Sequence, residues 1–151
     1  NRRLVNETKE TKTMTMTLED IEHLPVKVRY VGEAPSKWPS SSNRTTVHQW
    51  AITVTGKDGC HHMFDYFTGL GRRQGLKSPK PPKVADILYS LLSDASAEQR
   101  NFHEWCSDYG HSLDSISALN AYRACLDTAH ALHKCFSDEL LAELRDLLAE
   151  Y

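Results

Sequence analysis

Apolar and polar residues alternate along three stretches in the first half of the chain. These stretches are residues 26–34, 47–55 and 60–68, and all three are rich in β-branched and aromatic residues. A period of two is typical of strands with one buried face. In the second stretch the alternation places three bulky residues on the same face: Trp50, Ile52 and Val54.

Residues that favour turns separate these three strands. Residues 56–59 read Gly-Lys-Asp-Gly, which predicts a hairpin turn, and residues 35–46 form a polar loop with two prolines. Short or polar connections between consecutive strands predict an antiparallel meander. Trp38 lies in the polar loop, where it is a candidate for partner binding; packing back onto the sheet is the alternative.

After Pro82 the spacing of apolar residues changes from two to that of a helix. The first helical stripe has five members: Val84, Ile87, Leu88, Leu91 and Leu92. Residues 96–99 resemble a capping box that opens a second helix. We expect this helix to bury Phe102, Trp105, Cys106 and Tyr109 and to end at Gly110.

Two further helices are predicted towards the C-terminus. One begins near Asp114 and carries an apolar face, and Ser137 caps the other, which is rich in leucine. The residues expected on the apolar face of the third helix are Ile116, Leu119, Tyr122, Leu126, Ala129 and Phe136. For Trp105 we expect four close neighbours: Leu88, Leu92, Leu119 and Tyr122.

These elements predict an α+β protein, with a three-stranded antiparallel sheet followed by a bundle of about four helices packed on one face. A length of 151 residues suits one domain over residues 17–151. Within it we assign a sheet (26–68), a basic linker (69–83) and a helical part (84–151). Residues 17–20 predict a short helical turn that Pro25 stops, and residues 1–16 predict a flexible arm.

Composition and charge narrow the class of protein. Hydrophobic residues make up 40% and charged residues 25%, as in ordinary globular domains. The net charge of −2 conceals an asymmetry, because residues 1–80 hold 13 Lys and Arg against 8 Asp and Glu, whereas residues 81–151 hold 5 against 12. We expect a protein of the cytoplasm, with four free cysteines and no membrane partner.

The glycine-rich stretch at residues 69–75 resembles a phosphate-binding loop but lacks its spacing. Five residues separate Gly69 from Gly75 where a P-loop has four, and Leu76 stands where the lysine is needed. We therefore predict a basic linker and no nucleotide cofactor. The basic side chains of this linker are candidates for binding nucleic-acid phosphates or an acidic protein surface: Arg72, Arg73, Lys77, Lys80 and Lys83.

Two pairs of side chains on the predicted helices are candidates for metal binding. His103 with Cys106, and His130 with His133, have the spacing at which two facing helices could hold zinc. Cys106, however, fits an apolar stripe, so we interpret these residues as core and surface residues and predict no metal. Neither the cysteines nor the carboxylates form a recognisable catalytic signature, and no catalytic residue is assigned.

Four segments together resemble a family of small proteins encoded by bacteriophages and prophages. The segments are Phe64–Arg72, Asp86–Ala97, Phe102–Gly110 and Asp114–Cys125, so the resemblance covers roughly residues 46–151. Small phage proteins of this kind resemble inhibitors of host defence, including anti-CRISPR proteins. The linker of this chain is shorter than the family's usual insertion, so a role carried by a longer insertion does not transfer.

The resemblance implies a non-enzymatic inhibitor that binds a bacterial defence protein or ribonucleoprotein complex in the cytoplasm of the host. Acidic helices would imitate a nucleic-acid backbone, with Glu98, Glu104 and Asp108 as the expected contact residues. The alternative from another class is a nucleic-acid-binding protein that uses the basic sheet and linker. A metal- or thiol-dependent enzyme is the third hypothesis.

Overall fold

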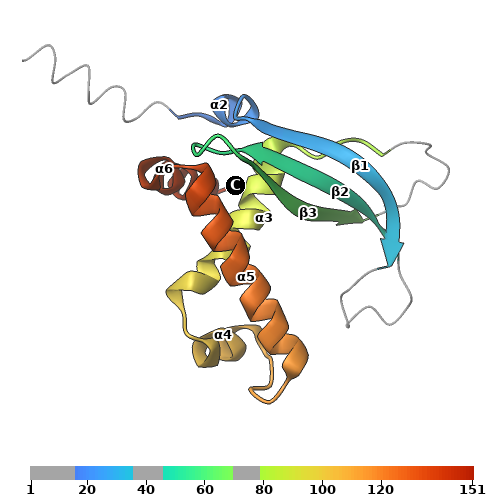
Figure 1. Cartoon of the computed structure of the whole chain (residues 1–151), viewed down its shortest axis with the longest axis vertical. Coiled ribbons are helices and arrows are strands. Elements are labelled where there is room, and N and C mark those ends of the chain that lie inside the picture. The colour runs from blue at the N-terminus through green and yellow to red at the C-terminus, as the bar shows by residue number, and fades with distance from the viewer. Residues whose placement is uncertain (1–15, 36–45, 70–78) are drawn as a thin grey trace, which may run out of the picture.

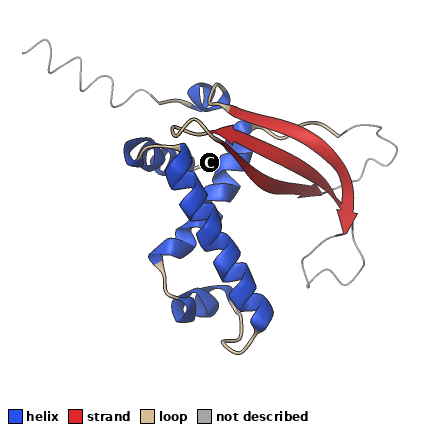
Figure 2. Ribbon diagram, in the orientation of Figure 1, coloured by secondary structure: helices blue, strands red, loops and turns tan. Residues whose placement is uncertain are grey.

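A computed structural model describes residues 16–35, 46–69 and 79–151. It confirms the α+β class, with a three-stranded antiparallel sheet followed by helices. Figure 1 shows the sheet at one end of the molecule and a helical arm that extends away from it, and Figure 2 separates strands from helices. In chain order the elements are α2 (Leu18–Glu22), β1 (Val26–Pro35), β2 (Thr46–Thr55), β3 (His61–Gly69), α3 (Val84–Ala95), the 3-10 helix η1 (Ser96–Gln99), α4 (Phe102–Tyr109), α5 (Ile116–Cys135) and α6 (Asp138–Leu148).

The strands pair in the order β1-β2-β3, and their alternation gives the sheet one buried face. The predicted trio of Trp50, Ile52 and Val54 is buried, as the period of two indicates. Trp50 donates a hydrogen bond from its indole nitrogen to the Thr68 hydroxyl at 2.9 Å. A polar group on the buried face is thereby satisfied, which keeps the cost of its burial low.

A β-bulge interrupts the pairing of β1 with β2. The register shifts between Tyr30 and Gly32, so Val31 is the extra residue and its side chain points to solvent. Gly32 adopts a φ of 140°, which a residue with a Cβ rarely tolerates. The bulge accounts for the bend of β1 that is visible in Figure 1.

The main hydrophobic core lies between the buried face of the sheet and three helices. All five residues of the predicted first stripe are buried there, from Val84 to Leu92. The C-terminal half of α5 contributes Ala129 and Leu132, and α6 contributes Leu141 and Leu144. Ser137 caps α6 as expected, with its hydroxyl accepting from the Leu140 amide at 3.1 Å.

The first turn of α3 receives its cap from a distant residue. Lys83 makes no capping hydrogen bond through its side chain, but the Glu22 carboxylate accepts from the amides of Val84 at 3.2 Å and Ala85 at 3.1 Å. A carboxylate at a helix N-terminus also interacts favourably with the helix dipole. The short helix α2 is therefore held against α3, and it places Ile21 in the core.

A second, smaller hydrophobic cluster lies in the arm. Its fully buried members are Ala97, Trp105, Cys106 and Ala118, and α4 packs there against the N-terminal half of α5. Figure 1 shows α4 at the far end of α5 from the sheet. The long helix α5 thus joins both cores, because its two halves belong to different clusters.

Four predictions about the helices are corrected by the structure. Residues 96–99 form a 3-10 turn that continues α3, because Ser96 is helical and its hydroxyl donates to the Ser93 carbonyl. The capping box of α4 is formed instead by Asn101 and Glu104. Tyr109 and Ile116 were expected in the core, yet 51% and 75% of their surfaces are exposed, because Tyr109 contacts Trp105 from the end of α4 and Ile116 is the first residue of α5. Leu88 and Leu92 belong to the main core and not to the cluster around Trp105.

Candidate functional site: partner-binding surfaces

The residues predicted to bind a partner divide into two groups. Trp38, Arg72, Arg73 and Lys77 lie outside the described residues. The three acidic candidates are described and exposed, and they come from η1 (Glu98) and α4 (Glu104 and Asp108). Glu104 and Asp108 are one helical turn apart on α4, so the structure brings these two together and leaves Glu98 elsewhere.

Glu98 connects η1 to two other helices. Both of its carboxylate oxygens lie 3.0 Å from Nε2 of His133 in α5, and one lies 3.5 Å from the Arg145 guanidinium in α6. His133 also lies 3.5 Å from Asp138. Glu98 therefore has an evident role in holding the junction of three helices.

Glu104 and Asp108 also have partners within the chain. The Glu104 carboxylate accepts from the Asn101 amide at 3.0 Å, as half of the capping box. Asp108 lies 2.7 Å from Nε of Arg100, and the Arg100 guanidinium lies 5.7 Å from the centre of the Tyr109 ring. Exposed ion pairs of this kind contribute little to stability. The three carboxylates are thus engaged locally, although each remains accessible to solvent.

Aromatic rings gather around Trp105 in the arm. The Trp105 ring stacks on His111 with a centroid distance of 4.9 Å and contacts Tyr109 and Tyr122 at 5.4 Å each. The Tyr122 hydroxyl donates to the Arg100 carbonyl at 2.6 Å, which fixes α5 against the start of α4. Offset and tilted ring contacts add to the area that these side chains bury. The arm therefore has a packed aromatic cluster of its own.

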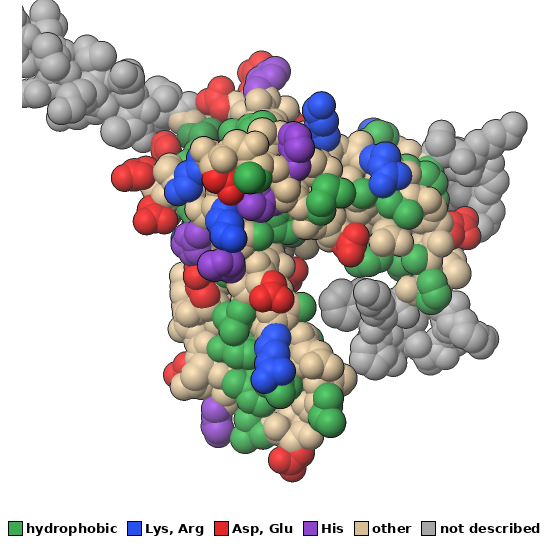
Figure 3. Space-filling model, in the orientation of Figure 1, with side chains coloured by type: hydrophobic (Ala, Val, Ile, Leu, Met, Phe, Trp, Pro, Cys, Tyr) green, Lys and Arg blue, Asp and Glu red, His purple; other side chains and the backbone are tan. Residues whose placement is uncertain are grey.

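Three large apolar side chains of the arm remain exposed, and we call them together the arm tip: Tyr109, Leu113 and Ile116. These residues come from the end of α4, the connection and the first position of α5, and their exposed fractions are 51%, 49% and 75%. Figure 3 shows hydrophobic side chains along this part of the arm. Three large apolar side chains that folding leaves in water are typical of a contact surface.

A groove separates the outer strand β3 from the helices α3 and α5. It has a volume of about 340 Å³, and its strand wall carries Met63, Asp65 and Phe67. The helical wall consists of Leu91, Asp94, Ala124, Asp127, Thr128 and Ala131, and Phe64 lies at its base. Figure 3 shows acidic side chains on both sides of the recess where the sheet meets the arm.

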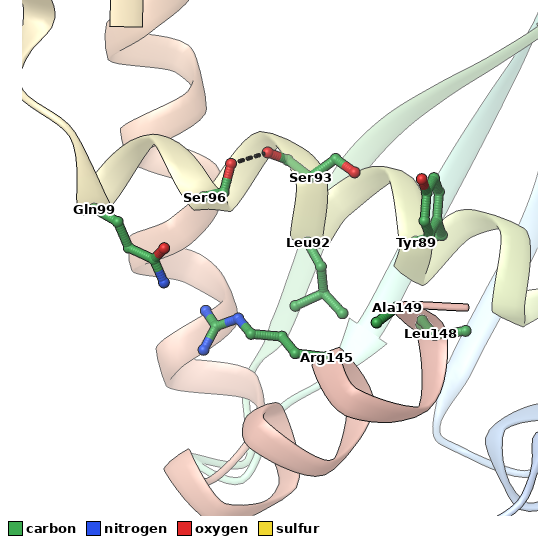
Figure 4. Close-up of a pocket in the computed structure, with 8 residues that line it drawn as sticks. All are labelled: Tyr89, Leu92, Ser93, Ser96, Gln99, Arg145, Leu148 and Ala149. Carbon is green, nitrogen blue, oxygen red and sulfur yellow. Dashed lines mark hydrogen bonds between the residues drawn. The ribbon is translucent and has the colours of Figure 1, made fainter. Parts of the chain in front are cut away.

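A second hollow of about 200 Å³ lies between α3, η1 and α6. Figure 4 shows Arg145 and Gln99 extending towards each other across it, with the apolar side chain of Leu92 beside Arg145. Ser96 lies on the far side but uses its hydroxyl to donate to the Ser93 carbonyl. Because Arg145 also contacts Glu98, the polar groups of this hollow are largely committed to the helix junction.

The described part of the sheet does not present a purely basic face. Lys27 and Arg29 point to solvent from β1, but the cross-strand register places Arg29, Ala51 and Asp65 in one row. β1 also carries the acid Glu33, which lies opposite His48. The cations of the linker that were expected to extend this face are mostly outside the described residues.

The candidate metal ligands do not come together. Cys106 is buried in the arm while His103 is exposed, and His133 is bound to Glu98. Among residues 16–35, 46–69 and 79–151, no group of three or more His, Cys, Asp or Glu side chains could hold a metal ion. Within the same ranges, no helix is long and apolar enough to cross a membrane.

Three of the four thiols are poorly suited to act as nucleophiles. Burial raises the pKa of Cys106. Burial and the charge of Asp94 raise the pKa of Cys125 to about 11. Burial and the charge of Asp58 raise the pKa of Cys135 to about 11. Since the thiolate is the reactive form, these side chains are protonated and inert at neutral pH. Cys60 is exposed.

We therefore expect one thiol of the folded protein, Cys60, to react rapidly with a chromogenic disulfide reagent at neutral pH. The other three should react only as fast as the protein opens, and all four should react at once in denaturant. Absorbance at the reagent's leaving-group band measures this directly. A Cys60→Ser variant should lose the rapid phase; a rapid phase that survives this substitution would contradict the described burial.

The arm tip was not found by reasoning from the sequence. Ile116 has the spacing of the apolar face of α5, so it was counted with the core. One sign of its exposure was present in the sequence: Ile116 directly follows the cap residue Ser115. The first turn of a helix often extends past the element on which the helix packs.

No family model, no curated protein sequence and no solved structure matches the chain.

Proposed function

We propose that this protein is a non-enzymatic inhibitor that binds a bacterial defence complex and blocks it by protein–protein contact. The arm tip carries the proposal. Tyr109, Leu113 and Ile116 are large apolar side chains that stay exposed on an arm with a packed cluster of its own, and a surface that is ordered before binding loses little conformational entropy when it binds. Large apolar and aromatic side chains at the centre of an interface typically supply most of its binding energy.

The biological setting of the proposal comes from the sequence. Residues 46–151 resemble small proteins of bacteriophages and prophages, and small phage proteins of this kind resemble inhibitors of host defence. A projecting arm suits such a role, because it can enter a recess of a large complex that a flat surface could not reach. The partner surface for Tyr109, Leu113 and Ile116 would be an apolar hollow on a defence protein.

Co-purification tests this proposal. Affinity-tagged protein is expressed in a host that carries a CRISPR–Cas complex and in an otherwise identical host that lacks it. We expect the subunits of the complex to be retained in stoichiometric amounts from the first host. If other defence systems are tested in the same way and none is retained, the proposal fails.

A further inference from the structure

The strand β3 lies at an edge of the sheet, and this edge faces the groove described above. No described strand pairs with β3 on the side away from β2. The Gly56 amide donates to the Cys60 carbonyl at 2.8 Å. This bond fixes which residue pairs of the hairpin exchange backbone hydrogen bonds, because hydrogen-bonded and non-hydrogen-bonded pairs alternate along it. Met63 and Asp65 consequently direct their backbone groups away from β2 and towards the groove. An edge of this kind is a template for one more strand.

The opposite wall of the groove leaves room for such a strand. Leu91 comes from α3 and Ala124 and Ala131 from α5, so the wall beside β3 consists largely of small or apolar side chains. Met63 is 63% exposed on the rim. A volume of about 340 Å³ holds a few residues of extended chain and not a helix or a folded domain.

The charge of the groove is uniformly negative. Its ionisable lining residues are Asp65, Asp94 and Asp127, and among the described residues no lysine or arginine lines it. Asp65 accepts one long hydrogen bond of 3.5 Å from Gln49. Within the described part of the chain, the carboxylates of Asp94 and Asp127 have neither a hydrogen bond nor an ion pair. Burial raises the pKa of the Asp94 carboxyl, and a cation placed beside it would favour the ionised form.

We infer that this groove binds an extended, Lys- or Arg-bearing segment of a partner protein, which adds to β3 as a fourth strand. Backbone hydrogen bonds to the β3 edge supply the affinity, as in other cases of strand addition. Because successive side chains of a strand point to opposite faces, one set reaches Asp94 and Asp127 beside the helices, and the other set reaches Asp65 on the outer face. Nucleic acid is disfavoured by three carboxylates. The groove is separate from the arm tip, so the inference stands independently of the proposed function.

The probe for this inference is a fluorescently labelled peptide of sequence TVKVRKVKT with blocked termini, which carries basic residues on both faces of an extended strand. We expect saturable binding to the full-length protein by fluorescence anisotropy. The double variant Asp94→Asn/Asp127→Asn should weaken it at least about tenfold. Asp146→Asn, on the exposed side of α6, removes a similar charge and should bind as the wild type does. Ile116→Glu should also leave binding unchanged.

Two further peptides separate strand addition from simple charge attraction. A version with its four central amides N-methylated keeps every charge but cannot pair along an edge, and it should not bind. A version with glutamate at every basic position should not bind either. The inference would be overturned if the methylated and unmethylated peptides bound with equal affinity. It would also be overturned if Asp146→Asn weakened peptide binding as much as Asp94→Asn/Asp127→Asn does. An oligomer, seen by sedimentation, that Asp94→Asn/Asp127→Asn dissolves would overturn it too, because the occupant would then be a second copy of this chain.

Discussion

Replacing Trp105 with alanine is expected to lower the free energy of unfolding by about 3–5 kcal/mol, which is the usual cost of removing a buried aromatic side chain. Trp105 is only 6% exposed and forms the centre of the arm's small core, where its ring contacts those of Phe102, Tyr109, His111 and Tyr122. Few other side chains could collapse into the space. Denaturant unfolding followed by circular dichroism measures the change.

The part of the protein that loses protection from hydrogen exchange distinguishes a defect of the arm's cluster from a defect of the main core. Because the arm has its own cluster, hydrogen exchange in the Trp105→Ala variant should accelerate first in α4 and the N-terminal half of α5, while β2 and α3 remain protected. The matched control is Tyr109→Ala, which removes a ring that is 51% exposed and should cost much less. A cost for Trp105→Ala near that of the control would contradict the described packing.

Placing glutamate at two positions of the arm tip, in a Leu113→Glu/Ile116→Glu variant, is expected to abolish retention of the partner without unfolding the protein. Loss of an interface hot spot costs about 2 kcal/mol or more, which is roughly thirtyfold in Kd. Both side chains are mostly in solvent, so the stability should change little. Glutamate at position 116 is also favourable for the dipole of α5, because Ile116 is its first residue.

Asn120→Glu provides the matched control for charge. Asn120 is exposed on α5 one turn beyond Ile116, so the substitution adds one negative charge to the same helix, as Ile116→Glu does, without removing an apolar side chain. The melting temperatures of all three proteins are compared first. If Asn120→Glu and the double variant reduce retention equally, the effect is one of charge and the arm tip is not the contact surface.

The sheet could be predicted because its strands and turns depend on residues that are neighbours in the sequence. From Trp50 to Val54 every second side chain is bulky and apolar, and one buried face requires this alternation whatever packs against it. The turn at 56–59 and the cap at Ser137 are also local, since each depends on the conformation of a few neighbouring residues. The bulge at Val31 left no such signal except the glycine that follows it.

The arm could be predicted only in part, because its structure depends on which surfaces meet. Ser96 with Gln99 and Asn101 with Glu104 have the same capping pattern, and the choice between them depends on whether α3 continues past Ala95. Similarly, periodicity identifies the apolar face of α5 but not the point at which it passes from the arm's cluster to the main core. Ile116 was misplaced for this reason.

The candidate surfaces were the least predictable feature. Glu98, Glu104 and Asp108 were chosen as exposed acids on helices, and the structure places each beside a partner that explains its presence. Asp94 and Asp127 look the same in the sequence, yet neither has such a partner among the described residues. Tertiary contacts alone make this distinction.

Plating efficiency tests the central claim most directly. A phage that a host's CRISPR–Cas system restricts is plated on that host while it expresses the wild-type protein, the Leu113→Glu/Ile116→Glu variant or Asn120→Glu. The account predicts that the wild type and Asn120→Glu restore plating by orders of magnitude, and that the double variant, folded and equally abundant, does not. Full restoration by the double variant, or no restoration by the wild type on any defended host, would contradict it.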